Sequence, residues 1–245
     1  MALDGQTLNV EDYPLLWIDG GYTATFKGNT FDLATNAGND IWAGDAIDYA
    51  NETSIDLSNE SLTTNFSATF LGRFRNLTAL TVPDNTSISL DLSLNAKLEE
   101  LSARGNSLTS IDVSNNTLLT DLFVQENSLT SIDVSNNTAL INFRINTNSL
   151  TSIDVSSNTE LKLFYCFSNS LTSIDISNNT KINNLRCQAN QLNAAVNSQI
   201  LIDLDGHGLS NGYLNSSIFG GGTLTAAGQT AKTNLLSKGW TIVGI

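Results

Sequence analysis

The chain has 245 residues and a formal net charge of −13, from 11 basic and 24 acidic side chains. A chain this acidic, with no basic stripe, is not expected to bind nucleic acid or an anionic membrane surface. No apolar run approaches the roughly 18–20 residues that a membrane helix needs, so membrane insertion is not expected. The first residues also lack the charged and apolar regions of a secretion signal.

The first 51 residues are rich in glycine and aspartate and follow no repeat. They contain several aromatic residues, namely Tyr13, Trp17, Tyr22, Phe31 and Trp42. The open first edge of a repeat array needs a cover, because unpaired strand edges invite association. We therefore expect residues 1–51 to form an irregular N-terminal cap or docking segment. A short helix is expected within residues 61–76, inside the first degenerate repeat.

A repeat dominates the middle of the chain. Eleven asparagines recur from Asn85 to Asn190 with spacings that alternate between 10 and 11 residues, so the full repeat is 21 residues with two similar halves. The best-kept copies are 108–128, 129–149, 150–170 and 171–191. Each half has two apolar residues separated by one, which predicts a strand with alternate side chains pointing inward. A period of this length predicts a solenoid.

This pattern resembles the leucine-rich repeat superfamily, specifically its bacterial and phage subtype with a nested 21-residue repeat. The resemblance covers residues 77–192. It implies a mainly β, right-handed parallel solenoid, and because both halves carry the strand pattern we expect two strands per coil. The solenoid is expected to span residues 52–192 and to be regular from residue 77, with all six inward positions of each repeat buried.

The recurring asparagines and the two cysteines are interpreted as structural. An asparagine side chain can both donate and accept, and an unpaired buried backbone group costs about 1–3 kcal/mol, so the ladder is expected to pair the backbone at each turn. Cys166 and Cys187 occupy the same inward position of adjacent repeats. We expect them to be small core residues.

Residues 193–245 change character. Helices are predicted over 194–209 and 226–240, followed by a short strand at 241–245. The pattern resembles a terminal module found after repeat arrays in phage tail and virion proteins, and predicts a small α/β cap. Asp203, Asp205 and His207 imitate the first half of a calcium loop, but Leu214 stands where a bidentate acid is needed, so no metal is predicted.

Nothing in the chain predicts catalysis. His207 is the only histidine, and neither a phosphate-binding loop nor a zinc-protease motif is present. The evenly spaced aspartates, such as Asp133 and Asp154, belong to the repeat rather than to a catalytic pair. Carboxylates stacked on adjacent coils are expected to repel one another and to have raised pKa values. We therefore expect no enzyme and no cofactor.

The two halves of the repeat present different outward residues. The first half repeats Ser-Asp-Ser almost unchanged, whereas the second half varies at nearly every outward position. Aromatic and arginine side chains are common anchors at interfaces, so this variable face is predicted to bind a partner. Drift on a solvated face is the alternative. The predicted binding residues are Arg104, Phe123, Gln125, Arg144, Asn146, Tyr165, Phe167, Arg186 and Gln188.

Two functions fit these expectations. The first is a non-enzymatic virion component, in a tail or spike, that binds a host-surface protein or glycan and is held by other virion proteins. The second is a secreted bacterial surface adhesin without its signal peptide. Localisation is accordingly expected in the virion, or at the cell surface or outside the cell in the second case. A third idea is that the Ser-Asp-Ser face binds a regular lattice such as ice or a mineral.

Overall fold

The computed structural model describes residues 2–3, 6–7, 23–26, 29–32, 53–56, 71–72, 74–85 and 89–245. Near the N-terminus it contains two antiparallel pairs, β1 (Ala2–Leu3) with β2 (Gln6–Thr7) and β3 (Thr23–Phe26) with β4 (Asn29–Asp32). The expected N-terminal cap and the expected helix within 61–76 lie largely outside the described residues.

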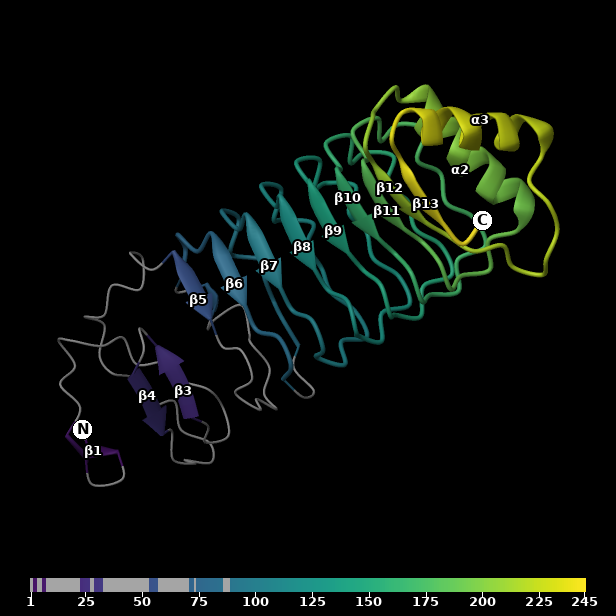
Figure 1. The fold of residues 1–245 in the computed structure, drawn as a ribbon. Helices are drawn as coiled ribbons and strands as arrows, with labels where there is room; N and C mark the ends of the chain where they lie inside the picture. Colours follow the sequence, from purple (N-terminus) through teal and green to yellow (C-terminus); the bar gives the residue numbers. More distant parts are fainter. Residues whose placement is uncertain are drawn as a thin grey trace.

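A nine-stranded parallel sheet runs along the solenoid in chain order, as Figure 1 shows. Eight of its strands follow one another as β5 (Ser54–Asp56), β6 (Ala79–Thr81), β7 (Glu100–Ser102), β8 (Asp121–Phe123), β9 (Asn142–Arg144), β10 (Leu163–Tyr165), β11 (Asn184–Arg186) and β12 (Tyr213–Asn215). The last is β13 (Thr241–Val243). From β6 to β11 each strand is displaced by 21 residues from the one before it, which confirms a mainly β parallel solenoid.

Each 21-residue turn contributes one strand, so the expectation of two strands per coil is wrong. The strand comes from the second half of the repeat, while the first half, for example residues 129–134, is extended chain without a ladder. The side chains of the first half explain this difference. The carboxylate of Asp133 accepts the backbone N–H of Ser135 at 2.9 Å, and Asn137 donates to the carbonyl oxygen of Val113 on the preceding turn. Backbone groups that would build a second ladder are paired with side chains instead.

The core is a set of apolar columns inside the coil. The central residue of each strand from β6 to β12 points inward and is fully buried, as in Leu122, Phe143 and Phe164, and the rings of Phe143 and Phe164 stack with their centroids 5.7 Å apart. In the four copies from 108 to 191, five of the six inward positions are buried as expected. The sixth is only partly buried in three of these copies, at Ile111, Ile132 and Ile153, and is buried in the fourth, at Ile174.

The first asparagine ladder lies at the tight turns behind the sheet. Its members are completely buried: Asn95, Asn116, Asn137, Asn158 and Asn179. The amide of Asn137 donates to the carbonyl oxygens of Val113 and Asn116 at 3.0 and 2.8 Å, and the next two members repeat this pair of bonds one turn further on. Each side chain thus joins its own turn to the preceding one by donating to two backbone carbonyl oxygens at the bend.

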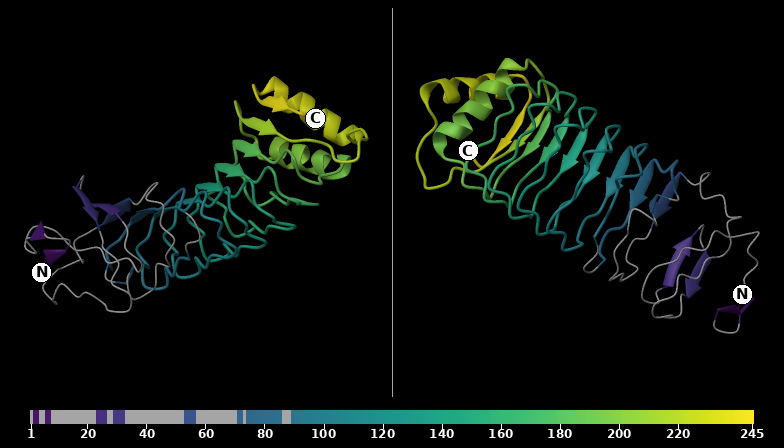
Figure 2. Two further views of the ribbon diagram at one scale, coloured as in Figure 1. Left: turned by 90° about the horizontal axis from the view of Figure 1, so that it is seen from below. Right: turned by 180° about the vertical axis from the view of Figure 1, so that it is seen from behind.

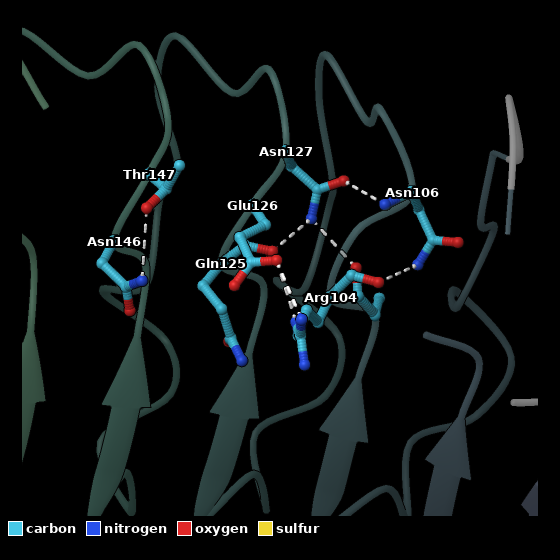
Figure 3. Close-up of polar contacts among 8 residues, drawn as sticks. Arg104, Asn106, Gln125, Glu126, Asn127, Asn146 and Thr147 are labelled. Carbon is cyan, nitrogen blue, oxygen red and sulfur yellow. Dashed lines mark hydrogen bonds and ion pairs between the residues drawn. The ribbon is translucent and has the colours of Figure 1, made fainter. Parts of the chain in front are cut away.

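The second asparagine ladder lies where the strands end. Asn127 donates to Ala103 of the preceding turn and to Val124 of its own. Its side-chain oxygen accepts the backbone N–H of Leu108 and that of Asn106 (Figure 3). The residue before each asparagine has a left-handed backbone, with φ near +57° at Thr147 and +69° at the corresponding Gly105. The turn therefore needs both a left-handed residue and a side chain that caps the coil, as expected of an asparagine ladder.

The C-terminal residues extend the same sheet with two longer turns. Helix α2 (Ala194–Gly206) precedes β12, and α3 (Ala226–Ser237) precedes β13. The helices and the last strand agree with the sequence-based prediction. The pattern gave no indication of β12, because Gly212-Tyr213-Leu214 holds a single inward apolar residue where the repeats have two.

The two helices pack against each other at the C-terminal end of the solenoid (Figures 1 and 2). Gly228 permits the contact, because a Cβ atom there would lie 2.6 Å from the Cβ of Ser198. The hydroxyl of Ser198 also accepts the N–H of Thr225, which caps α3, at 2.9 Å. Beside them Trp240 packs over Gly212, and its indole N–H donates to the carbonyl oxygen of Leu209. These contacts close the end of the core with side chains rather than with further coils.

Candidate recognition face

The outward side chains of the strands form a face on which residues of successive turns stand in register. Parallel pairing aligns Phe123 with Arg144, Arg144 with Tyr165, and Tyr165 with Arg186. Tyr213 on β12 pairs with Asn184, and so lies diagonally beside Arg186 on the same face. We call these five side chains, from Phe123 to Tyr213, the aromatic–arginine row.

The row alternates rings and guanidinium groups in contact. The guanidinium carbon of Arg144 lies 4.9 Å from the ring centroid of Phe123 and 5.4 Å from that of Tyr165. That of Arg186 lies 4.7 Å from Tyr165 and 5.0 Å from Tyr213. Each cation is therefore held between two ring faces, an arrangement worth about 0.5–1 kcal/mol per contact at an exposed site. The side chains stabilise one another in fixed positions before any partner arrives.

Burial shows which atoms of the two arginines remain available. The Nε atoms of Arg144 and Arg186 are covered and have no hydrogen-bond partner, whereas the residues as a whole are half-buried. The exposed part of each guanidinium is therefore its Nη end. A planar fork of this kind suits bidentate contacts with carboxylates.

The nine predicted binding residues fall into three groups. Phe123, Arg144, Tyr165 and Arg186 lie in the row, and Phe167 adjoins it, with its ring centroid 6.4 Å from that of Tyr165. Gln125 and Gln188 are half-buried at the strand ends, and each has a covered side-chain oxygen without a partner. The remaining two lie outside the row, one in an ion pair and one buried.

Arg104 and Asn146 are those two residues. Arg104 forms an ion pair with Glu126 at 3.0 Å (Figure 3), which occupies its guanidinium group. Asn146 is only 6% exposed, and its amide faces Thr147 at 3.5 Å. The side chains of the predicted set that contact one another on the strand face are therefore Phe123, Arg144, Tyr165, Phe167 and Arg186.

Sequence reasoning missed Tyr213 and the outward position that precedes the inward residue on each strand. That position holds Glu100, Asp121, Asn142, Leu163 and Asn184 on β7–β11. The alternation of inward and outward residues makes this position outward as well, but the prediction considered only the outward residues that follow the inward one. At this position the residues on β7 and β8 are acidic and those on β9–β11 are uncharged. The carboxylate of Asp121 on β8 accepts the side-chain amide of Asn142 on β9 at 2.7 Å.

The repetitive Ser-Asp-Ser face behaves differently from the expectation of raised pKa values. Hydrogen bonds from the side chain and backbone of Ser135 lower the pKa of Asp133, and the corresponding serines lower the pKa of Asp112, Asp154 and Asp175. Repulsion between neighbouring carboxylates is a smaller effect in the opposite direction, for example on Asp154. Local serine donors therefore outweigh the crowding of like charges, because the carboxylates are exposed to water.

A shallow depression of about 230 Å³ lies on this repetitive face, between two successive turns. Its lining includes the half-buried Ile132 and Ile153 and the carboxylates Asp133 and Asp154. Both carboxylates already accept a backbone N–H of their own turn. The depression is thus lined by the repeat itself and carries none of the aromatic or arginine side chains of the strand face.

Away from the strand face, the cysteine thiols and the histidine ring nitrogens are buried, and Asp205 already forms an ion pair. Cys166 and Cys187 are free and fully buried, as expected of core residues, and burial raises the pKa of the Cys187 thiol to about 12. Neither ring nitrogen of His207 bonds a described residue. Asp205 pairs with Lys238 at 2.5 Å.

In the described part of the chain, no group of three or more acidic, histidine or cysteine side chains is placed to hold a metal ion. No helix in those residues has the length and apolarity needed to cross a bilayer.

Solved structures share this architecture. The functional domain of internalin J from Listeria monocytogenes, which includes a cysteine ladder, is 32% identical with a TM-score of 0.57 over 69% of this chain. Internalin C2 from the same organism is 19% identical with a TM-score of 0.65 over 86%. A leucine-rich repeat protein from Leptospira interrogans is 20% identical with a TM-score of 0.63 over 79%. The fold is a leucine-rich repeat solenoid.

The leucine-rich repeat chain covers unequal shares of these proteins. It spans 36% of the internalin J domain, 85% of internalin C2 and 50% of the Leptospira protein. No protein-family model matches the sequence, and no curated protein matches it. The comparisons therefore support the leucine-rich repeat solenoid as the fold.

Proposed function

We propose that this leucine-rich repeat chain is a non-enzymatic recognition module that binds a protein partner through its strand face. The aromatic–arginine row carries the proposal. It presents large rings and guanidinium groups in fixed positions, and such side chains supply most of the binding energy at protein interfaces. Side chains that are already ordered lose little conformational entropy on binding, which favours affinity.

The contrast between the two faces supports the choice of surface. The repetitive face shows the same serines and aspartates on every turn, with the carboxylates bonded to their own backbone. The strand face changes from acidic on β7 and β8 to aromatic and cationic on β9–β11. A surface that differs at each turn can distinguish one partner from another, whereas a uniform one cannot specify a unique register.

Alanine substitution on the two faces tests this function. Tyr165→Ala and Phe167→Ala are each expected to weaken attachment to candidate host cells by about 2 kcal/mol, or roughly thirtyfold, because they remove ring anchors. The matched controls Ser152→Ala and Ser173→Ala lie on the repetitive face and are expected to bind like the wild type. Circular dichroism melting of every variant establishes that it is folded. Equal losses from both sets, or from neither, would place the binding surface elsewhere.

The particle or cell that carries the chain is proposed on separate grounds. The pattern of residues 202–241 supports a phage particle as the carrier, with other virion proteins holding the chain and a host-surface protein as its target. The alternative carrier is a bacterial surface, as an adhesin. Mass spectrometry of purified phage particles and of the bacterial envelope fraction decides between them, since the chain is expected in the particle in the first case and in the envelope in the second.

A further inference from the structure

Arg144 and Arg186 are cations without an acidic partner on a strongly acidic protein. The chain carries a net charge of −13. The ion pairs described within the resolved repeats and C-terminal turns join Arg104 with Glu126, Lys181 with Glu160, and Lys238 with Asp205. None of the described ion pairs or hydrogen bonds involves the guanidinium group of Arg144 or Arg186. The chain has more than twice as many acidic as basic side chains, 24 against 11, yet these two cations face outward unpaired.

The aromatic rings hold the two guanidinium groups in place. Each lies between two rings, with carbon-to-centroid distances from 4.7 to 5.4 Å. The covered Nε atoms leave the Nη ends facing outward. On the same three strands the neighbouring outward position holds Asn142, Leu163 and Asn184, which bring no charge of either sign. The result is a local cationic site whose geometry is fixed by stacking rather than by a counter-ion.

The spacing of the two cations sets the spacing of a complementary ligand. Arg144 and Arg186 are in register two strands apart, and strands lie about 4.8 Å apart, so the two side chains are separated by about 10 Å. A polyproline II segment advances about 3.1 Å per residue with three residues per turn. Carboxylates on every third residue of such a segment thus stand about 9 Å apart on one side, within reach of both forks.

We propose that this site binds an acidic polypeptide segment of the partner, with two carboxylates paired to Arg144 and Arg186. The inference rests on the proposed function of the strand face and specifies the partner's chemistry. Charge complementarity is its main support, since bidentate pairs with carboxylates are the preferred contacts of arginine forks.

The charges of the face also limit where the acidic residues of the partner can lie. Glu100 and Asp121 precede the row on β7 and β8. A carboxylate over those strands would meet like charge, which disfavours binding. The acidic residues of the partner therefore lie over β9–β11, and a continuous acidic run that extends to β7 is disfavoured.

A designed peptide tests the inference directly. The probe is a fluorescein-labelled peptide of two Glu-Pro-Pro repeats, which places two glutamates about 9 Å apart, compared with the same peptide carrying glutamine in place of glutamate. Fluorescence anisotropy at low salt is expected to show binding of the glutamate peptide alone. Arg144→Gln and Arg186→Gln are each expected to weaken it about tenfold or more. The double variant Lys162→Gln and Lys181→Gln, which changes net charge by the same amount as both arginine substitutions together, is expected to bind like the wild type.

Lysine substitution and salt separate a fixed fork from simple charge attraction. Arg144→Lys keeps the charge but loses the planar fork and much of the stacking, so it is expected to bind the glutamate peptide more weakly than the wild type. Wild-type binding is expected to weaken as salt rises, because salt screens exposed charges. Equal binding by wild type and Arg144→Lys would overturn the assignment of a bidentate site.

The remaining outcomes also decide the proposal. Failure of folded wild-type protein to bind the glutamate peptide overturns it, as does equal binding by the arginine-to-glutamine variants. If heparin binds through Arg144 and Arg186 and the peptide does not, the site recognises a sulfated glycan and the polypeptide inference is wrong. Attachment to host cells that depends on Tyr165 and Phe167, without peptide binding, leaves the proposed function standing and removes only this inference.

Discussion

A single asparagine side chain joins two successive turns at each buried bend of the solenoid. The amide of Asn137 pairs with the carbonyl oxygens of Val113 and Asn116, and the residue is fully buried. Asn148, from the second ladder, makes comparable bonds to Val124 and Ile145 but is partly exposed. Water can replace a lost partner at the second site and not at the first, so burial rather than bond number sets the importance of each asparagine.

Asn137→Ala is expected to destabilise the protein by about 1–3 kcal/mol, because it removes two buried hydrogen bonds, each worth about 0.5–1.5 kcal/mol. Asn148→Ala is expected to cost less, since water reaches its partners. Asn136→Ala provides the control, because Asn136 is exposed and makes one bond, to Ser114 at 3.2 Å. Urea unfolding of the three variants measures the order. A larger loss for Asn136 than for Asn137 would contradict the role of burial.

The Asp-x-Ser pairs of the repetitive face connect stability to pH. Hydrogen bonds from Ser135 lower the pKa of Asp133 in the folded protein. A lowered folded pKa means that the carboxylate contributes stability above its unfolded pKa of about 3.9, and that this contribution is lost as pH falls through the folded value. The effect belongs below about pH 4, and the exposure of the carboxylate keeps it small.

Ser135→Ala is expected to raise the pKa of Asp133 towards its ordinary value, because the hydroxyl donor is the largest cause of the shift. Carbon-detected NMR titration of the Asp133 carboxyl measures the change. Asp175 in the same protein serves as an internal reference, since it bonds Ser177 and is expected to titrate as in the wild type. An unchanged Asp133 titration would show that the hydroxyl does not set the pKa.

At the scale of the element, the repeat builds one strand and one pair of tight turns. The chain makes a turn at Val134–Asn137 and another at Asn137–Leu140, where backbone bonds of 3.0 and 3.1 Å close each bend. In the last two units, helices α2 and α3 replace these turns. The change lengthens the step between strands from 21 residues to 29 and then 28, counted from Asn184 to Tyr213 and from Tyr213 to Thr241.

Gly228→Leu is expected to separate the two terminal helices. A Cβ atom at position 228 would lie 2.9 Å from the Cα of Ser198, so backbone as well as side chain must move. Overpacking of this kind costs about 1–3 kcal/mol. Ala227→Leu is the control, because Ala227 is exposed on the same helix. Differential scanning calorimetry is expected to show a lower melting temperature for Gly228→Leu alone.

The molecule as a whole is a one-dimensional stack in which each turn covers the core of its neighbour. The C-terminal end is closed by β12, β13, α2 and α3, which follow β11 in one continuous sheet. Leu185 and Cys187 on the last regular turn are fully buried beneath these elements. The terminal turns therefore protect the apolar interior that the repeats share.

A chain truncated after Leu192 is expected to lose this protection and to melt at a lower temperature, with increased binding of an apolar fluorescent dye. Deletion of one complete repeat, residues 129–149, is the matched control. It shortens the stack but keeps both ends, so it is expected to stay folded without dye binding. If the truncated chain melts like the shortened one, then residues 193–245 are not needed to close the core.

The sequence by itself determined the repeat, its inward residues and the turn asparagines, because a strict period forces equivalent residues into equivalent positions. It also located α2 and α3, since their caps and glycines are local features. It misplaced one of the two strands per coil. Alternating apolar residues such as Ile132 and Val134 indicate which side chains point inward, but not whether neighbouring backbones pair.

The tertiary structure decided the site. Residues 21 apart, such as Arg144 and Tyr165, become neighbours only when the coils stack in register, and Arg186 reaches Tyr213 across a longer step. The structure also showed that Glu126 occupies Arg104 and that burial withdraws Asn146. The sequence contains the identities of these side chains, whereas their contacts depend on the distance and register between turns, which only the folded coil establishes.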